Sequence, residues 1–193
     1  MLRMVEPADS DEALMLRYAA GDVLAFETLY VRHELKVWRY ILRSVGNQAT
    51  ADELLQDVWL AVSQAARRYQ PTARFTTWIY TLAHHRVIDA YRRTRPVQSL
   101  DAANDGDEPL LERLAAEPDA DPLHQVVALH DAQALLAALA TLPLEQREAF
   151  LMQAEGELSV EEIAAATGVN FETAKSRLRY ARARLRQKLQ EQA

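Results

Sequence analysis

The sequence predicts an all-α fold made of two small helical domains joined by an acidic flexible linker. Ala, Leu, Glu and Arg are abundant and favour helix, whereas only five of the 193 residues are glycine. No segment shows the alternation of apolar and polar residues that a half-buried strand requires. Residues 96–122 carry four prolines and eight acidic residues without sustained periodicity, which is typical of an exposed linker.

Capping residues and glycines delimit the first two predicted helices. Ser10 or Asp9 caps the first helix, which is expected to end at Gly21. Asp22 caps a long second helix that ends at Gly46. Short polar side chains can accept hydrogen bonds from the free N–H groups of a helix start, and glycine readily adopts the left-handed conformation that ends many helices.

The third helix is expected to begin at Thr50, because residues 50–53 read Thr-Ala-Asp-Glu, a capping-box pattern, and Pro71 closes this region. At 100° per residue, its inward stripe consists of Leu54, Leu55, Val58 and Val62. The outward side holds Asp52, Glu53, Gln56, Asp57 and, among them, Leu60. A leucine within an acidic face favours a partner surface that is basic and partly apolar. A solvated face with one stray leucine is the alternative.

The fourth helix is predicted from about Thr76 to Arg93, with an inward face made of Ile79, Ala83, Val87 and Ala90. Another side carries Trp78, Thr81, His85, Asp89 and Arg92. A basic helix with aromatic residues suits an unstacked single strand, because bases stack on rings and phosphates meet arginine. We expect Trp78 to pack structurally and Asp89 to pair with Arg86 or Arg93.

Four helices are also predicted after the linker, and the last two form a helix-turn-helix. One helix lies near Leu123–Leu139, and another follows Pro143 and ends at Gly156. In the terminal pair, Ser159 and Glu162 form a capping box, Gly168 supplies the positive φ of a tight turn, and Asn170 caps the last helix.

The last helix is basic although the chain as a whole has a net charge of −6. Seven of the eight basic residues after position 130 lie within 175–188. The inward side of the helix is expected to hold Ala174, Leu178, Ala181, Leu185 and Leu189. The opposite side carries Glu172, Lys175, Ser176, Arg179, Tyr180 and Ala183, flanked by Arg177, Arg182, Arg184, Arg186 and Lys188. Such a mixture of charge, hydroxyl and aromatic groups suits a reader of the DNA major groove, and a solvated arginine-rich helix is the alternative.

Several classes of function are disfavoured by what the sequence lacks. It has no cysteine, hence no thiolate metal site and no disulfide framework, which fits a reducing cytoplasm. It has no apolar segment typical of a signal peptide, and its longest apolar run, 134–142, is too short to span a membrane. His85 and Asp89 share a helix side, but two ligands make a poor metal site. No nucleophile–base pair or glycine-rich phosphate loop is evident, so we expect neither catalysis nor a cofactor.

The sequence resembles bacterial RNA polymerase sigma factors of the sigma-70 family, extracytoplasmic-function (ECF) type. The segments "GDVLAFETLYVRH" and "ADELLQDVWLAV" resemble regions 2.1 and 2.2, and "FTTWIYTLAHHRVIDAYRR" resembles regions 2.3 and 2.4. The segments "TLPLEQREAFLM" and "LSVEEIAAATGVNFETAKSRLRYARARLRQKL" resemble the two parts of region 4. These motifs stand in the family's order and cover about 11–93 and 131–190, with the acidic linker where such proteins join their two domains.

The resemblance implies a role for each part of the chain. Sigma region 2 would occupy 10–95, the acidic Pro-rich linker 96–122 and sigma region 4 123–193. The core polymerase would bind Asp52, Glu53, Gln56, Asp57 and Leu60 through its β′ clamp helices. The melted −10 element would contact Thr81, His84, His85, Arg92 and Arg93. The −35 duplex would contact Lys175, Ser176, Arg177, Arg179 and Tyr180.

The implied partners are therefore the RNA polymerase core, through its β′ clamp helices and β flap, and promoter DNA. An anti-sigma factor is a further candidate partner, and we expect a cytoplasmic protein without membrane insertion. Members of the family often carry Asn at the position of His85, which leaves the −10 preference open. The alternative function is a stand-alone helix-turn-helix regulator with an N-terminal sensor or dimerisation domain, which would bind promoter DNA without polymerase. A metal-dependent helical enzyme is a third class, and it would require metal in the purified protein.

Overall fold

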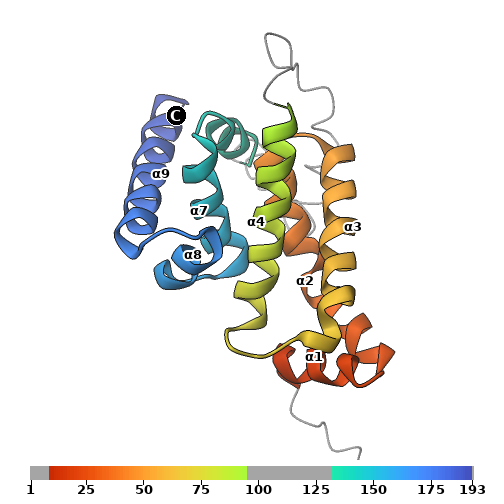
Figure 1. Cartoon of the computed structure of the whole chain (residues 1–193). Coiled ribbons are helices and arrows are strands. Elements are labelled where there is room, and N and C mark those ends of the chain that lie inside the picture. The colour runs from red at the N-terminus through yellow and green to blue at the C-terminus, as the bar shows by residue number, and fades with distance from the viewer. Residues whose placement is uncertain (1–8, 95–131, 193) are drawn as a thin grey trace, which may run out of the picture.

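The structure, a computed structural model, describes residues 9–94 and 132–192, and within these ranges every regular element is a helix (Figure 1). The predicted all-α fold is therefore confirmed. The predicted linker at 96–122 and the first part of the helix predicted near Leu123–Leu139 lie outside the described residues.

The N-terminal half contains the four predicted helices. These are α1 (Asp11–Ala19), α2 (Val23–Val45), α3 (Gln48–Ala65) and α4 (Phe75–Thr94), with a short 3-10 turn at Ala66–Arg68 after α3. The long α2 packs against α1, α3 and α4 and lies at the centre of this half. The inward stripes predicted for α3 and α4 are buried, as are Leu29, Val37 and Ile41 of α2. Apolar burial of these faces is the main source of stability for such helices.

The predicted caps are confirmed for α1 and α2 but not for α3. Ser10 and Asp22 accept hydrogen bonds from N–H groups of the following turn, and Gly46 ends α2 with a φ of 73°. The third helix begins earlier than predicted, because Asn47 is its cap and accepts a hydrogen bond from the Thr50 N–H. Asn caps a helix at least as well as Thr, so the chain enters the next helix directly after Gly46.

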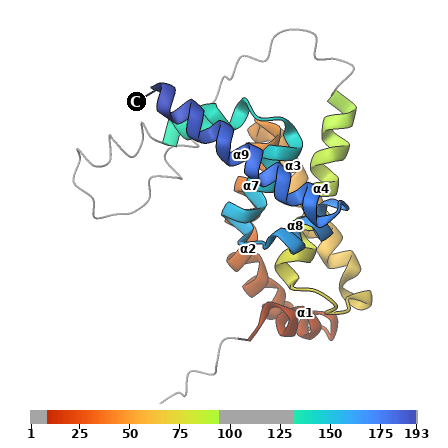
Figure 2. The ribbon, with the colours of Figure 1, turned by 90° about the vertical axis from the view of Figure 1, so that its left-hand side faces the viewer.

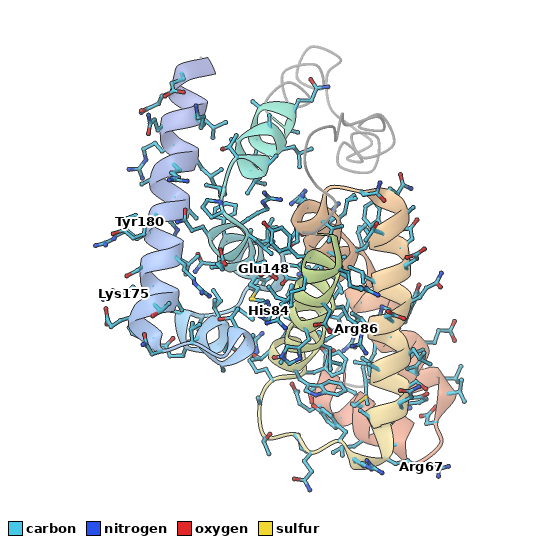
Figure 3. The ribbon with its side chains drawn as sticks, turned by 45° about the horizontal axis from the view of Figure 1, so that its top comes forward. Arg67, His84, Arg86, Glu148, Lys175 and Tyr180 are labelled. Atoms are coloured by element: carbon cyan, nitrogen blue, oxygen red, sulfur yellow. The ribbon has the colours of Figure 1, made fainter. Side chains whose placement is uncertain are left out.

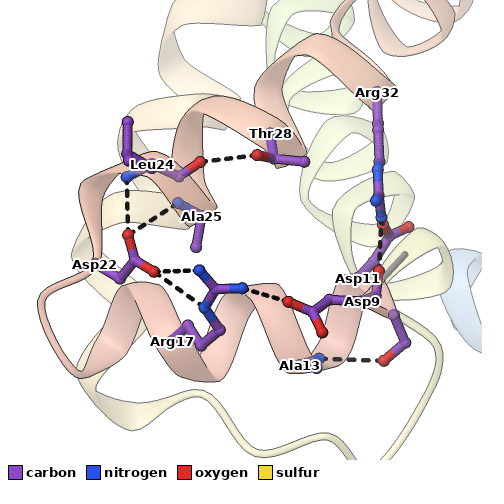
Figure 4. Close-up of polar contacts among 10 residues, drawn as sticks. Asp9, Asp11, Ala13, Arg17, Asp22, Leu24, Ala25, Thr28 and Arg32 are labelled. Atoms are coloured by element: carbon purple, nitrogen blue, oxygen red, sulfur yellow. Dashed lines mark hydrogen bonds and ion pairs between the residues drawn. The ribbon is translucent and has the colours of Figure 1, made fainter. Parts of the chain in front are cut away.

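Ion pairs at the chain start join α1 to the beginning and middle of α2 (Figure 4). The Arg17 guanidinium donates to the carboxylates of Asp9 and Asp22. Its hydrogen bond to Asp22 lowers the pKa of the Asp22 carboxyl. Arg32 of α2 donates to the Asp11 carboxylate over 2.8 Å. Asp22 thus caps α2 and also fixes the angle at which α1 meets it.

The C-terminal half consists of the helix at 132–140, then α7 (Leu144–Gly156), α8 (Val160–Thr167) and α9 (Phe171–Gln192). As predicted, α7 follows Pro143 and ends at Gly156. The residue after it, Glu157, adopts a left-handed backbone conformation with a φ of 55°, which is uncommon for residues other than glycine and asparagine. The core of this half is formed by Leu139, Leu151, Met152, Ile163 and Leu178.

The two halves pack directly against each other. Helix α7 lies along α2 and touches α4, and α8 lies between α4 and α9 (Figures 1 and 2). Helix α9 contacts α7 and α8 and lies on the outer side of the molecule, away from α3. The buried residues of both halves form one continuous apolar cluster.

Candidate nucleic-acid and protein interfaces

Helices α8 and α9 form the predicted helix-turn-helix, and each predicted turn residue takes the expected conformation. Ser159 and Glu162 make both hydrogen bonds of a capping box at the start of α8. Gly168 ends α8 with a φ of 67°, a conformation that costs little only for glycine. Asn170 then accepts a hydrogen bond from the Thr173 N–H over 2.8 Å and caps α9. These contacts fix the direction in which α9 leaves the turn.

The exposed side of α9 carries the residues predicted to contact duplex DNA. Lys175 and Tyr180 point away from the rest of the molecule (Figure 3), and the Lys175 side chain is 60% exposed. Arg179 is exposed next to Tyr180, whereas Ser176 and Arg177 are partly buried along the edge of this face. The structure therefore places all five residues on one helix, with the three most exposed near its first turns.

The inward side of α9 is shorter than predicted. Ala174, Leu178, Ala181 and Leu185 are buried, but Leu189 is 36% exposed, which corrects its predicted place in the core. It instead lines a shallow hollow between α9, α7 and the helix at 132–140, together with Leu135, Phe150, Arg182, Leu185, Arg186 and Gln190. The hollow is mostly apolar and bordered by two arginines, so it can accept an apolar segment with acidic neighbours.

The outward face of α3 has the composition predicted for a protein interface. Asp52, Glu53, Gln56, Asp57 and Leu60 are all exposed, and Leu60 exposes 56% of its surface. Asp52 is also held in place, because it accepts a hydrogen bond from the Trp38 indole over 2.7 Å. The helix thus presents carboxylates around one apolar side chain.

An apolar hollow lies beside Leu60, and the sequence analysis did not find it. It has a volume of about 340 Å³ and is lined by Phe26, Tyr30, Leu55, Gln56, Trp59 and Leu60. The rings of Phe26 and Tyr30 pack on Trp59 at centroid distances of 5.6 Å and 4.9 Å. Phe26 and Tyr30 are one helical turn apart on α2, and this i, i+4 aromatic pair could have indicated the hollow.

The residues predicted to meet single-stranded DNA do not all share one face of α4. His85, Arg92 and Arg93 are exposed, and Thr81 is partly buried with its hydroxyl bonded to the Thr77 carbonyl. His84 is turned towards α7, where its Nδ1 lies 2.9 Å from Glu148 Oε1 (Figure 3). His84 is therefore engaged within the protein.

Trp78 on α4 has the role expected for it, whereas Asp89 has a different partner. Trp78 packs against Tyr69 and Phe75, with ring centroids 5.0 Å and 5.7 Å away, which confirms its structural role. Asp89 lies 3.9 Å from Arg92, not beside Arg86 or Arg93 as predicted. The i, i+3 spacing brings Arg92 to the same side of the helix, whereas Arg86 is partly buried.

Within 9–94 and 132–192 there is no group of three or more His, Cys, Asp or Glu side chains that could hold a metal ion. None of the helices in these ranges is both long enough and apolar enough to cross a membrane.

Comparison with known families and sequences gives matches over both halves of the chain. Residues 29–97 match the family model "Sigma-70 region 2", and residues 132–185 match "Sigma-70, region 4". The chain is 34% identical over 177 residues to the RNA polymerase sigma factor CarQ of Myxococcus xanthus, covering 92% of this chain and 96% of that one. It is 35% identical over 169 residues to the ECF RNA polymerase sigma factor RpoE of Cereibacter sphaeroides, covering 86% and 87%.

Solved structures share the fold. The structure of CnrH in complex with the cytosolic domain of CnrY superposes with a TM-score of 0.68 at 22% identity, covering 96% of this chain and 100% of that one. The sigma factor RpoE of Bartonella quintana, solved with the anti-sigma factor NepR, gives a TM-score of 0.66 at 21% identity, covering 86% and 96%. The order and packing of the helices described above are therefore those of a known fold.

Proposed function

Because this chain belongs to the ECF sigma factors of the sigma-70 family, we propose that its exposed surfaces divide promoter recognition among them. As a sigma factor, the protein directs the RNA polymerase core to promoters and initiates transcription there. We propose that region 2 spans 10–95 and region 4 spans 123–193, and that different residues serve core polymerase binding, −35 recognition and −10 capture.

We assign core polymerase binding to α3. The observation that carries this assignment is the exposed Leu60 beside the aromatic hollow, surrounded by Asp52, Glu53 and Asp57. An apolar anchor with a pocket at its side, ringed by charge, is the usual composition of a binding hot spot. A basic, partly apolar helix pair such as the β′ clamp helices matches this surface in charge and chemistry.

We assign −35 recognition to the exposed side of α9, through Lys175, Ser176, Arg177, Arg179 and Tyr180. Arg and Lys side chains form the commonest specific contacts with guanine in the major groove, and residues at the start of a recognition helix reach the base edges. We assign the hollow around Leu135, Phe150 and Leu189 to the β flap, because this hollow lies on another side of α9 and would stay free on DNA.

We assign capture of the melted −10 strand to α4, through Thr81, His84, His85, Arg92 and Arg93. Exposed His85, Arg92 and Arg93 can meet phosphates and bases directly. His84 is bonded to Glu148 in this arrangement, so its contact with DNA requires that the two halves separate.

We expect specific promoter binding by this chain to depend on core polymerase. Electrophoretic binding assays with a promoter selected from genomic DNA should show a specific complex only when core polymerase is present. Specific promoter binding by the purified chain alone would favour the stand-alone regulator instead. The same promoter in an in vitro transcription assay should give a transcript with core polymerase and this chain.

Three broader properties complete the proposal. The protein carries out no bond chemistry itself, and its place of action is the cytoplasm, where the polymerase is. Relatives of this fold have been solved with the anti-sigma factor NepR and with the cytosolic domain of CnrY, which supports an anti-sigma factor as a partner of this chain too. Co-purification of the chain from its own cells, followed by mass spectrometry, tests that partner.

A further inference from the structure

The contact between the two halves is polar at its centre, and Glu148 of α7 is the central residue. Glu148 is 1% exposed, and its Oε1 accepts a hydrogen bond from the Tyr40 hydroxyl of α2 over 2.6 Å. The same oxygen lies 2.9 Å from Nδ1 of His84 on α4. Burial raises the pKa of the Tyr40 hydroxyl, and the adjacent Glu148 carboxylate raises it further. Both of these partners belong to the opposite half, so Glu148 serves the contact between the halves.

Three more carboxylates of the C-terminal half meet the N-terminal half in the same way. Glu155 pairs with Arg43, and both side chains are almost fully buried. Glu157 accepts from Lys36 over 2.9 Å at the exposed margin. Glu162 of α8 accepts from the Thr77 hydroxyl over 2.9 Å and lies 3.4 Å from the Arg74 guanidinium. We call Glu148, Glu155, Glu157 and Glu162 the acidic edge, and Lys36, Arg43, Arg74 and His84 the basic face.

This contact cannot persist on a promoter. The −35 and −10 elements are named by their positions, which are about 25 base pairs apart, and this is about 85 Å along B-form DNA at 3.4 Å per base pair. A compact body of this chain length is about 40 Å across. Here α8 of the −35 reader packs directly on α4, the proposed −10 reader. A chain of 27 residues such as 96–122 can span up to about 90 Å, so a separated arrangement is within its reach.

We infer that the structure is a closed state of the sigma factor, in which the acidic edge occupies the basic face and withholds His84 and the start of α4 from single-stranded DNA, while His85, Arg92 and Arg93 stay exposed. Carboxylates of the chain itself thus hold His84, which is one of the proposed −10 contacts, and the cationic groups of α2 and of the residue before α4. This inference rests on the proposed function of α4. The outer side of α9 is not covered, so the closure leaves the −35 reader free but holds it too close to α4 for both readers to meet one promoter.

Buried charged and unsatisfied polar groups limit the stability of the contact between the halves. Burying ionised groups costs free energy that their pairing only partly returns. Oε2 of Glu148 and the Tyr80 hydroxyl are buried without a hydrogen-bond partner among the described residues. These unsatisfied groups weaken the contact, and water would reach them once the halves separate.

Two variants open the contact by different means. Glu148→Ala removes the acceptor shared by Tyr40 and His84. Gly156→Ala is a steric wedge, because a Cβ there would lie 2.9 Å from two ring carbons of Tyr80, which is fully buried in the opposite half. That Cβ would also lie 2.6 Å from a Leu158 methyl group, which can change its rotamer. Glu145→Ala is the matched control, since Glu145 is an exposed carboxylate on the same helix.

The experiment measures the distance between the halves in the full chain. The chain has no cysteine, so Gln64→Cys on α3 and Ala183→Cys on α9, both exposed positions, would carry the only thiol-linked donor and acceptor dyes. Single-molecule energy transfer should give one dominant short-distance population for the wild type and for Glu145→Ala. Glu148→Ala and Gly156→Ala should each raise the long-distance population about ten-fold relative to the short one. Circular dichroism checks that the helices persist.

The second readout is binding of a random-sequence single-stranded DNA by the same proteins, followed by fluorescence anisotropy. Both opening variants should bind at least about five-fold more tightly than wild type at equal salt. A long-distance wild type, or unchanged distances in both variants, would overturn the closed state. Opening without tighter DNA binding would overturn the masking of His84 and the start of α4. The distance is measured without DNA or polymerase, so it stands or fails separately from the proposed promoter contacts.

Discussion

The guanidinium of Arg179 lies over the ring of its neighbour Tyr180, with its central carbon 5.0 Å from the ring centroid, and both side chains are exposed on α9. A cation held on an aromatic face keeps a defined direction at low entropic cost. We therefore predict that Arg179→Ala changes which −35 bases are preferred, with a loss of about 1–3 kcal/mol at the base it contacts. Binding of the polymerase holoenzyme to a panel of −35 variants measures this change.

Lys188→Ala is the comparison for that experiment. Lys188 lies further along α9 and pairs with Glu191 over 2.9 Å, so we expect it to meet phosphates only. Its loss should weaken all promoters alike and reduce the salt dependence of binding. Identical base preferences in the wild type and Arg179→Ala would contradict the assignment of Arg179.

Leu60→Asp and Asp57→Arg should weaken core polymerase binding while leaving the fold intact. Both side chains are exposed on α3, so no core contact is lost. Removal of an interface anchor typically costs about 2 kcal/mol or more, which corresponds to roughly thirty-fold weaker binding. Fluorescence titration with core polymerase tests this, with Glu145→Arg as an exposed charge-reversal control. Normal binding by both variants would refute the α3 interface.

Gly168→Ala should destabilise the helix-turn-helix. Gly168 has a φ of 67° but open space around its Cα, so the cost of a side chain is conformational and not steric. We expect a loss of about 1 kcal/mol in the free energy of unfolding, and a smaller loss for Gly168→Asn, because asparagine tolerates the left-handed region. Urea unfolding distinguishes the two. Equal losses in both variants would show that this backbone conformation is not the cause.

Glu162→Gln should flatten the acid side of the stability profile. Burial would raise the pKa of the Glu162 carboxyl, but hydrogen bonds from the Ser159 N–H and the Thr77 hydroxyl, with the charge of Arg74, lower it below 4.5. A lowered pKa means a stabilisation that is present above pH 4.5 and is lost as the pH falls through the folded-state value. The difference in unfolding free energy between wild type and variant should therefore be largest near neutral pH and shrink below 4.5. A pH-independent difference would contradict it.

The segment 96–122 should tolerate changes of sequence better than changes of length. A scrambled Val97–Asp121 of equal composition should keep most transcription activity, because reach and charge are preserved. Deleting half of this segment should reduce transcription, since it could no longer span the distance between the two promoter elements. Loss of activity on scrambling alone would indicate specific contacts by this segment.

Local sequence determined most of the helices but not how the two halves meet. Caps such as Ser10, Asp22 and Ser159 act within one turn, so the positions of their helices could be predicted. The capping-box pattern at 50–53 predicts a start at Thr50, but Asn47 lies three residues earlier and is the cap, and periodicity does not choose between the two. The role of Glu148 could not be predicted, because its partners Tyr40 and His84 are 108 and 64 residues away in the sequence. Local sequence patterns do not indicate contacts between residues that are so far apart in the chain.

Glu157 ends α7 in a left-handed conformation and pairs with Lys36 of the opposite half. Replacement by glycine would relieve the backbone cost and make an isolated C-terminal half more stable, yet it would remove a contact from the closed molecule. Glu157→Gly would thus raise the melting temperature of an isolated C-terminal half but weaken the contact between the halves in the intact chain. In the intact chain the two halves should melt as one cooperative unit, and an opened chain should melt in two steps, each half at its own temperature.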